Sequence, residues 1–287
     1  MTIRTPPAWG WEELTHGLRS LGSADPDQYW PNARLNLAVP IVRRLHLSDL
    51  RDALARGWED FGAYRTDVLF LCIVYPLVGL VMARLASGHN FLPLVFPLAS
   101  GFALVGPFVA VGLNEMSRRR ELTQTASFWD AFAIFVSPAF LKVAILGCVL
   151  VGLFLTWLVA AQAIYVLTLG PLPPESMAQF THDVLHTKAG WTMIAAGCGV
   201  GFVFAVVVLT ISVVAFPMLL DRNVSIEIAV RTSILVVTTN PGTMAVWGLV
   251  IAALLVAGSI PLLLGLVVVM PVLGHATWHL YRHAVSV

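Results

Sequence analysis

Apolar residues in this chain gather in long runs separated by short polar segments. The runs cover approximately residues 68–86, 91–113, 139–168, 190–220 and 243–283. Runs of about 18 or more apolar residues are typical of transmembrane helices. The pattern therefore predicts an all-α, polytopic membrane protein.

The last run is too long for one crossing of a membrane. A single helix over residues 243–283 would extend ~60 Å, about twice the thickness of the hydrocarbon layer. We place a turn at Gly258, Ser259, Ile260 and Pro261, because proline removes a helix hydrogen bond and the Gly-Ser pair weakens the turn before it. The sequence thus predicts six transmembrane helices, arranged as three hairpins.

The distribution of basic residues predicts the orientation of these hairpins. With six spans, both termini lie on the same side of the membrane. Fifteen of the 17 lysines and arginines fall on that side, and the other two are Arg84 and Lys188. Positive residues favour the cytoplasmic side, so we expect both termini in the cytoplasm.

Composition narrows the class of protein further. Hydrophobic residues make up 58% of the chain and charged residues 11%, whereas soluble domains carry roughly 25% charged residues. This excludes a water-soluble enzyme. The net charge of +1 gives no broad basic field for nucleic acid, so the lipid bilayer is the expected partner.

The N-terminal segment differs from the rest of the chain. Residues 1–40 lack the apolar core of a signal peptide, and we expect a partly ordered cytoplasmic tail followed by a membrane domain at 41–287. Each of the three cysteines, Cys72, Cys148 and Cys198, lies inside an apolar run. We expect buried free thiols there and no disulfide framework.

A short pattern recurs before each predicted hairpin. The segments beginning at Ser48, Ser127 and Ser225 each have an acidic residue within three positions and an alanine about one helical turn later. Serine with an early carboxylate suits the start of a helix. The pattern predicts three short amphipathic helices at the cytoplasmic interface, each leading into one hairpin.

Several segments resemble a known family. They are residues 40–43, 54–61 and above all 270–282, which carry Pro271, Gly274, His275, Trp278 and His279, while residues 221–241 are similar to a pattern found in several groups of uncharacterised bacterial membrane proteins. Together they resemble the predicted integral membrane family called domain of unknown function, family 2189, over about residues 38–285. The resemblance implies a multi-pass protein of the bacterial cytoplasmic (inner) membrane. Some members carry the label of a cytochrome c oxidase subunit, and the resemblance assigns no activity.

Three histidines near the C-terminus are candidates for a metal or cofactor site. His275, His279 and His283 stand at i, i+4 and i+8, so they lie near one face of the last predicted helix. Imidazoles one turn apart can converge on a metal ion or a haem iron. The residues around them show no further ligand, so neither cofactor follows from the sequence alone.

The alternative for these histidines is structural. Trp278, Tyr281 and Arg282 would anchor the helix end among the headgroups, and histidines there favour the negative end of the helix dipole. His275 lies deepest, and an unpaired imidazole in hydrocarbon costs a few kcal/mol. We therefore expect it to be paired, with three candidate partners: Asn114, Glu115 and Asp221.

Other polar residues are expected to have structural roles. His182 and His186 are predicted on a short helix of the outer loop, and two histidines are too few for a typical zinc site. Glu115 or Asp130 is expected to pair with Lys142 or with an arginine of residues 118–120, fixing an interfacial helix to its hairpin.

Three classes of function remain open. The first is a non-enzymatic protein that binds partners, such as an accessory or assembly component of a membrane complex, possibly a respiratory one, or forms a homo-oligomer. The second is a channel or carrier, which bent helices would suit, because six prolines fall within predicted spans: Pro76, Pro93, Pro97, Pro107, Pro217 and Pro271. The third is a haem- or metal-binding redox protein. Motifs for hydrolysis, phosphoryl transfer and nucleotide binding are absent from the sequence, and we favour the first class, without catalytic residues.

Overall fold

The structure, a computed structural model, describes residues 40–64, 92–124, 127–261 and 264–286. These residues are almost entirely helical and contain no regular strand, which confirms the predicted all-α class. The predicted span at 68–86, Cys72 and nearly all of the tail at 1–40 lie outside the described residues.

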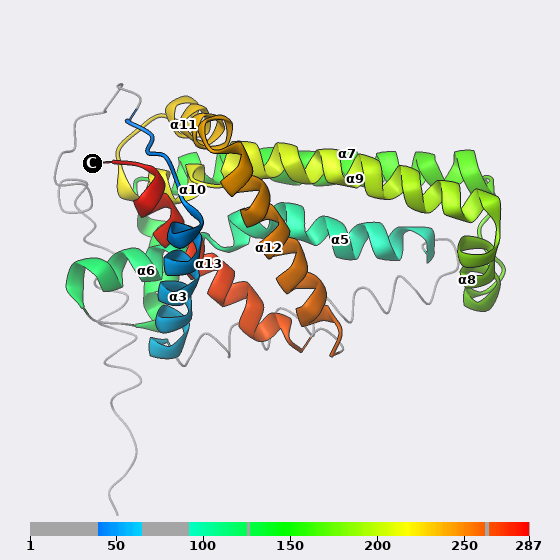
Figure 1. The fold of residues 1–287 in the computed structure, drawn as a ribbon, viewed down its shortest axis with the longest axis horizontal. Helices are drawn as coiled ribbons and strands as arrows, with labels where there is room; N and C mark the ends of the chain where they lie inside the picture. Colours follow the sequence, from blue (N-terminus) through cyan, green and yellow to red (C-terminus); the bar gives the residue numbers. More distant parts are fainter. Residues whose placement is uncertain (1–39, 65–91, 125–126, 262–263, 287) are drawn as a thin grey trace, which may run out of the picture.

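Three long apolar helices lie side by side along the longest dimension of the molecule (Figure 1). They are α5 (Leu92–Val109), α7 (Phe140–Leu169) and α9 (Lys188–Ser212). The short helix α8 (Met177–His186) joins α7 to α9 at the far end (Figure 1). We call α8 and residues 170–187 around it the distal end.

The described residues contain four segments that are long and apolar enough to cross a membrane. The segments are Pro93–Thr123, Phe140–Leu169, Lys188–Asp221 and Pro241–Ser259, the last of which is α12. Large apolar side chains point outward along them, among them Val159 and Phe202, about 70% exposed. Such faces suit contact with lipid, and the chain is a multi-pass membrane protein.

The other elements gather at the end opposite α8 (Figure 1). They are α3 (Leu47–Ala63), α6 (Val111–Thr123), the 3-10 helix η2 (Phe128–Val136), α10 (Ala215–Asp221), α11 (Ile226–Thr239) and the second half of α13 (Leu266–Ala284). We call this group the head. Within it, α3 runs across the direction of α7 and α9 (Figure 1).

The packing of α3 against α13 organises the head. The two helices are antiparallel and touch at Gly57, where an added Cβ would lie 2.7 Å from the backbone nitrogen of Ala276 and from the carbonyl oxygen of Val272. Beyond them, Arg43 N donates to Ala284 O at 2.9 Å and Ser286 N donates to Ile41 O at 3.1 Å. Segments that are far apart in sequence are therefore held together at both ends of this contact.

The three recurring serine segments all begin helices, but in different ways. Ser225 Oγ accepts from Ile228 N and caps α11, and Ser127 Oγ accepts from Trp129 N at the start of η2. The N-cap expected at Ser48 is wrong. Helix α3 begins at Leu47 and is capped at His46, two residues before the expected cap. The backbone N–H of His46 donates to the Asp49 carboxylate at 2.7 Å, because Asp49 stands three residues after His46 and not after Ser48.

Two of the apolar runs break as helices. The last run breaks where the sequence predicts, since α12 ends at Ser259 and the backbones of Gly258 and Gly265 cross closely. The run at 190–220 is interrupted at Val213, between α9 and α10. Val213 stands four residues before Pro217, and a proline ring clashes with the carbonyl group of the residue four positions earlier in a helix.

The prediction of buried thiols is wrong for the two cysteines that the structure describes. Cys148 and Cys198 are both exposed, on α7 and α9. An apolar run in a membrane helix has a lipid-facing side, so residence in such a run does not imply burial inside the protein.

Candidate functional site

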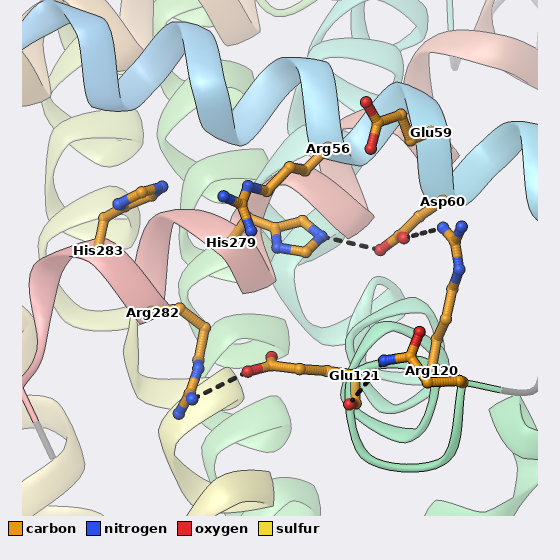
Figure 2. Close-up of a pocket in the computed structure, with 9 residues that line it drawn as sticks. Arg56, Glu59, Asp60, Arg120, Glu121, His279, Arg282 and His283 are labelled. Carbon is orange, nitrogen blue, oxygen red and sulfur yellow. Dashed lines mark hydrogen bonds and ion pairs between the residues drawn. The ribbon is translucent and has the colours of Figure 1, made fainter.

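A polar cavity of about 410 Å³ lies in the head between α3, α6 and α13 (Figure 2). Helix α3 contributes its last turns, α6 its C-terminal end, and α13 its last two turns. The lining residues are Arg56, Glu59, Asp60, Arg120, Glu121, Gln124, His279, Arg282 and His283. Almost all of them are charged or can be, so the cavity suits a polar ligand or a polar segment of a partner. We call it the head pocket.

Asp60 is the centre of the pocket wall. It follows Leu50, Ala53 and Gly57 on the buried stripe of α3 and is itself buried. Its Oδ2 accepts from Ser117 Oγ at 2.5 Å and lies 2.9 Å from His279 Nε2, and Oδ1 is paired with Arg120. Figure 2 shows His279 and Arg120 reaching this carboxylate from opposite sides.

These contacts keep Asp60 ionised. Burial by itself would raise the pKa of its carboxyl group, but the hydrogen bonds from His279 and Ser117 and the nearby imidazoles lower the pKa to about 2. The carboxylate is therefore charged at every physiological pH, and it acts as an acceptor that holds α6 and α13 against α3.

His275 is fully buried and paired, as expected, although not with any of the three expected residues. Its Nδ1 lies 2.8 Å from Ser117 Oγ, and its ring stacks on Tyr64 at 5.7 Å between centroids. Glu115, an expected partner, is directed instead to Arg118 at 2.8 Å. The expectation failed because depth in the membrane does not reveal which face of α6 meets α13.

The three C-terminal histidines face three different groups. His279 contacts Asp60, and His283 Nε2 lies 2.8 Å from Asp52 Oδ2, which also pairs with Arg56. Slight burial would raise the pKa of the Asp52 carboxyl group, but hydrogen bonds and charge from His283 and Arg56 hold that pKa below its usual value. Within the described part of the chain, no three His, Cys, Asp or Glu side chains are grouped so as to hold a metal ion. A haem or metal at His275, His279 or His283 stays a prediction.

The expected aromatic and cationic anchor is part of the protein interior. Trp278 and Tyr281 are buried, with Trp278 Nε1 donating to Glu121 at 2.9 Å and Tyr281 OH donating to Asp221 at 2.6 Å. Arg282 pairs with Glu121 at 2.9 Å and with Asp221 at 3.5 Å. These residues join α13 to α6 and α10 and do not form a lipid anchor, because the head surrounds this half of α13.

A second ionic cluster joins α6 to η2. Glu115, whose side chain is fully buried, binds Arg118 and Arg119 at 2.8 Å each, and Arg119 reaches Asp130 at 3.3 Å. This confirms the expected pairing of Glu115 and Asp130 with the arginines. Lys142 binds Asn223 instead, at 2.9 Å.

The distal end differs sharply from the head. His182 and His186 lie one turn apart on α8, with ring centroids 5.1 Å apart, and both are exposed. His182 Nδ1 lies 3.7 Å from Asp183. The predicted short helix is confirmed, and its histidines lie on a solvent-accessible face.

Asp60, Arg56 and Glu121 are pocket residues that the sequence did not single out, whereas Arg120 belongs to the group at 118–120 that was expected to form ion pairs. One signal was present for Asp60, which continues the spacing of the apolar stripe of α3 and thus places a carboxylate on its packed face. The arginines carried no such signal, because their contacts depend on packing between helices far apart in sequence.

Comparison with known proteins supports this architecture. Residues 95–221, from α5 to α10, match the family described as Predicted integral membrane protein (DUF2189). No curated protein and no solved structure matches the chain. The match leaves out α3 and α13, so it does not include the pocket residues of those two helices. Over residues 95–221 the chain is similar to the DUF2189 family of predicted integral membrane proteins, which confirms the family resemblance found in the sequence.

Proposed function

We propose that this protein is a non-enzymatic membrane component that binds a partner through the head pocket, as an accessory or assembly subunit of a membrane complex does. The observation that carries the proposal is the pocket itself, which opens between three helices and is lined by charged groups. Arginine is enriched at protein interfaces, and three arginines line this cavity.

The pocket arginines have donors to offer a partner. A guanidinium carries five N–H groups, and among the described residues Arg56 uses one for Asp52 and Arg120 one for Asp60. Their side chains are partly exposed, at 55% and 34%. Carboxylate or carbonyl oxygens of a partner segment would suit these donors, while Glu59 and Glu121 would accept from its N–H groups.

The proposal includes an orientation in the bacterial cytoplasmic membrane. Six spans form three hairpins, each preceded by an interfacial helix, with residues 1–40 as a tail, the head in the cytoplasm and α8 outside. Two observations support this arrangement. The head is rich in arginine, and the chain just after α13 pairs with the chain just before α3. Helices α3 and α11 lie in the head (Figure 1), and η2, the third interfacial segment, packs there against α6.

Photo-crosslinking in native membranes tests partner binding. A photoreactive residue at Gln124, in the pocket, should give a discrete protein adduct, and the additional change Arg56→Glu should remove it. The same residue at Gln179 on α8 is the matched control. Adducts with lipid alone at Gln124, or the same protein adduct at both positions, would contradict the proposed function.

A further inference from the structure

Helix α3 has two unlike flanks on either side of its packed stripe. Leu50, Ala53 and Gly57 face α13 and are buried. The flank toward the head pocket is polar. The opposite flank is apolar and consists of four residues spaced as on one helical side: Leu47, Leu54, Trp58 and Phe61. We call these four the apolar flank.

The apolar flank is open in the part of the chain that the structure describes. Leu47 is 61% exposed and Trp58 is 59% exposed, while Leu54 and Phe61 are partly buried. The Trp58 and Phe61 rings lie 5.8 Å apart, so they form one continuous surface. Tryptophan on an amphipathic helix is typical of the boundary between headgroups and acyl chains.

Exposed arginines lie on α3 and in the segment just before it. Arg51 lies on α3 next to Trp58 in angular position, and Arg43 and Arg44 are exposed in the segment just before α3. The nearest acidic residues of α3 have other partners. Asp49 accepts from the backbone N–H of His46, and Asp52 pairs with Arg56 and His283. The surface thus combines apolar bulk with basic groups that are not neutralised by those carboxylates.

The position of α3 completes the argument. The helix runs across the direction of α7 and α9, at the end of the molecule that holds the head (Figure 1). Because α7 and α9 are candidate membrane spans, a helix that runs across them at their head ends lies along the membrane surface. Its polar flank lines the pocket, which must contact water or a partner, so its apolar flank is the side available to lipid.

We propose that the apolar flank of α3 inserts into the cytoplasmic leaflet and that Arg43, Arg44 and Arg51 bind the phosphate groups of anionic phospholipids there. The inference rests on the orientation given under the proposed function. Apolar area and electrostatic attraction to anionic headgroups both contribute to such binding.

Spin labels test the insertion. In a background with Cys72, Cys148 and Cys198 changed to Ser, a label is placed at Trp58→Cys on the apolar flank or at Ala63→Cys on the polar side of the same helix. In nanodiscs, the label at 58 should be more accessible to oxygen and less accessible to an aqueous nickel complex than the label at 63. Equal accessibility to the nickel complex at both positions would overturn the insertion.

Lipid preference tests the role of the arginines. Protein is equilibrated with an equal mixture of phosphatidylglycerol and phosphatidylcholine, and the retained lipids are measured by native mass spectrometry. Each of Arg43→Gln, Arg44→Gln and Arg51→Gln should lower the preference for phosphatidylglycerol about fivefold. The control Lys188→Gln, at the start of α9, should leave it unchanged. An unchanged preference in all three arginine variants would overturn the proposal.

Failure of the lipid proposal can be distinguished from failure of the proposed partner binding. If Arg51→Gln loses the lipid preference but the Gln124 adduct still forms, both proposals stand. If the adduct is absent from the otherwise wild-type protein while the lipid preference is intact, only partner binding fails.

Discussion

The head and the distal end of this protein place their polar residues in opposite ways. In the head, Asp60, Glu115 and His275 are buried and each contacts partners on other elements or on the same turn. At the distal end, His182 and His186 are exposed on α8, where their rings lie beside each other and His182 lies near Asp183. Both ends carry histidine and aspartate, so composition alone does not distinguish them. The difference is that several helices converge on the head, whereas α8 only closes one hairpin.

The buried pair of Glu115 and Arg118 should give the largest difference in stability between a variant in the head and one at the distal end. Their side chains are 0% and 8% exposed, so Glu115→Ala leaves a buried arginine without its main partner. We expect a loss of about 3–5 kcal/mol in the free energy of unfolding. Thermal unfolding in detergent measures it. Asp183→Ala on α8 is the control, with an expected change within about 0.5 kcal/mol. Similar losses at both sites would contradict the contrast.

A second contrast compares buried with exposed histidine. His275→Ala removes the bond to Ser117 and the stacking on Tyr64, so we expect a loss of about 2–3 kcal/mol. His182→Ala should change stability by less than about 0.5 kcal/mol. The visible spectrum of the purified protein is recorded for both variants. A chromophore that disappears only in His275→Ala would show that this histidine is a ligand and not a structural residue.

The α3–α13 contact gives a third contrast, within one helix. Gly57→Ala places a Cβ 2.7 Å from the backbone of α13, so we expect a loss of about 1–3 kcal/mol despite the better helix propensity of alanine. Gly62→Ala meets nothing within 4 Å and should be neutral or slightly stabilising. Melting temperatures of the two variants measure this. Equal behaviour would mean that α3 does not pack closely on α13.

Much of the fold followed from the sequence because it depends on local signals. The apolar runs gave the long helices, Pro261 with Gly258 marked the turn after α12, and Ser225 marked the start of α11. The head could not be predicted in this way. Gly57 and Ala276 meet across more than two hundred residues, and nothing local to either residue indicates its neighbour.

The candidate site shows the same limit. The sequence identified His275, His279 and His283 as candidates for a metal or cofactor site, with a structural role as the alternative, and it predicted that His275 would be paired. It did not give Ser117 or Asp60 as partners, because a pairing depends on the rotation of α6 and α3 about their axes. That rotation is set by the packing of Tyr64 and Gly57.

A fourth prediction concerns the pH dependence of stability contributed by Asp60. Its folded pKa is about 2, below the ordinary value of about 3.9 in an unfolded chain. A depressed pKa contributes stability that is present above pH ~4 and is lost as the pH falls from ~4 to ~2. Asp60→Asn should lower the melting temperature at neutral pH and flatten its decline across this window. A decline of the same steepness in both proteins would show that Asp60 is not stabilised as a carboxylate.

The central claim is that the head pocket receives a partner in the native membrane while the distal end does not. In a background with the three native cysteines changed to Ser, thiols at Gln124→Cys and at Gln179→Cys can be labelled with a membrane-permeant reagent. The account predicts that Gln124→Cys reacts much more slowly in native membranes than after purification, whereas Gln179→Cys reacts equally in both. Equal rates for Gln124→Cys before and after purification would contradict it.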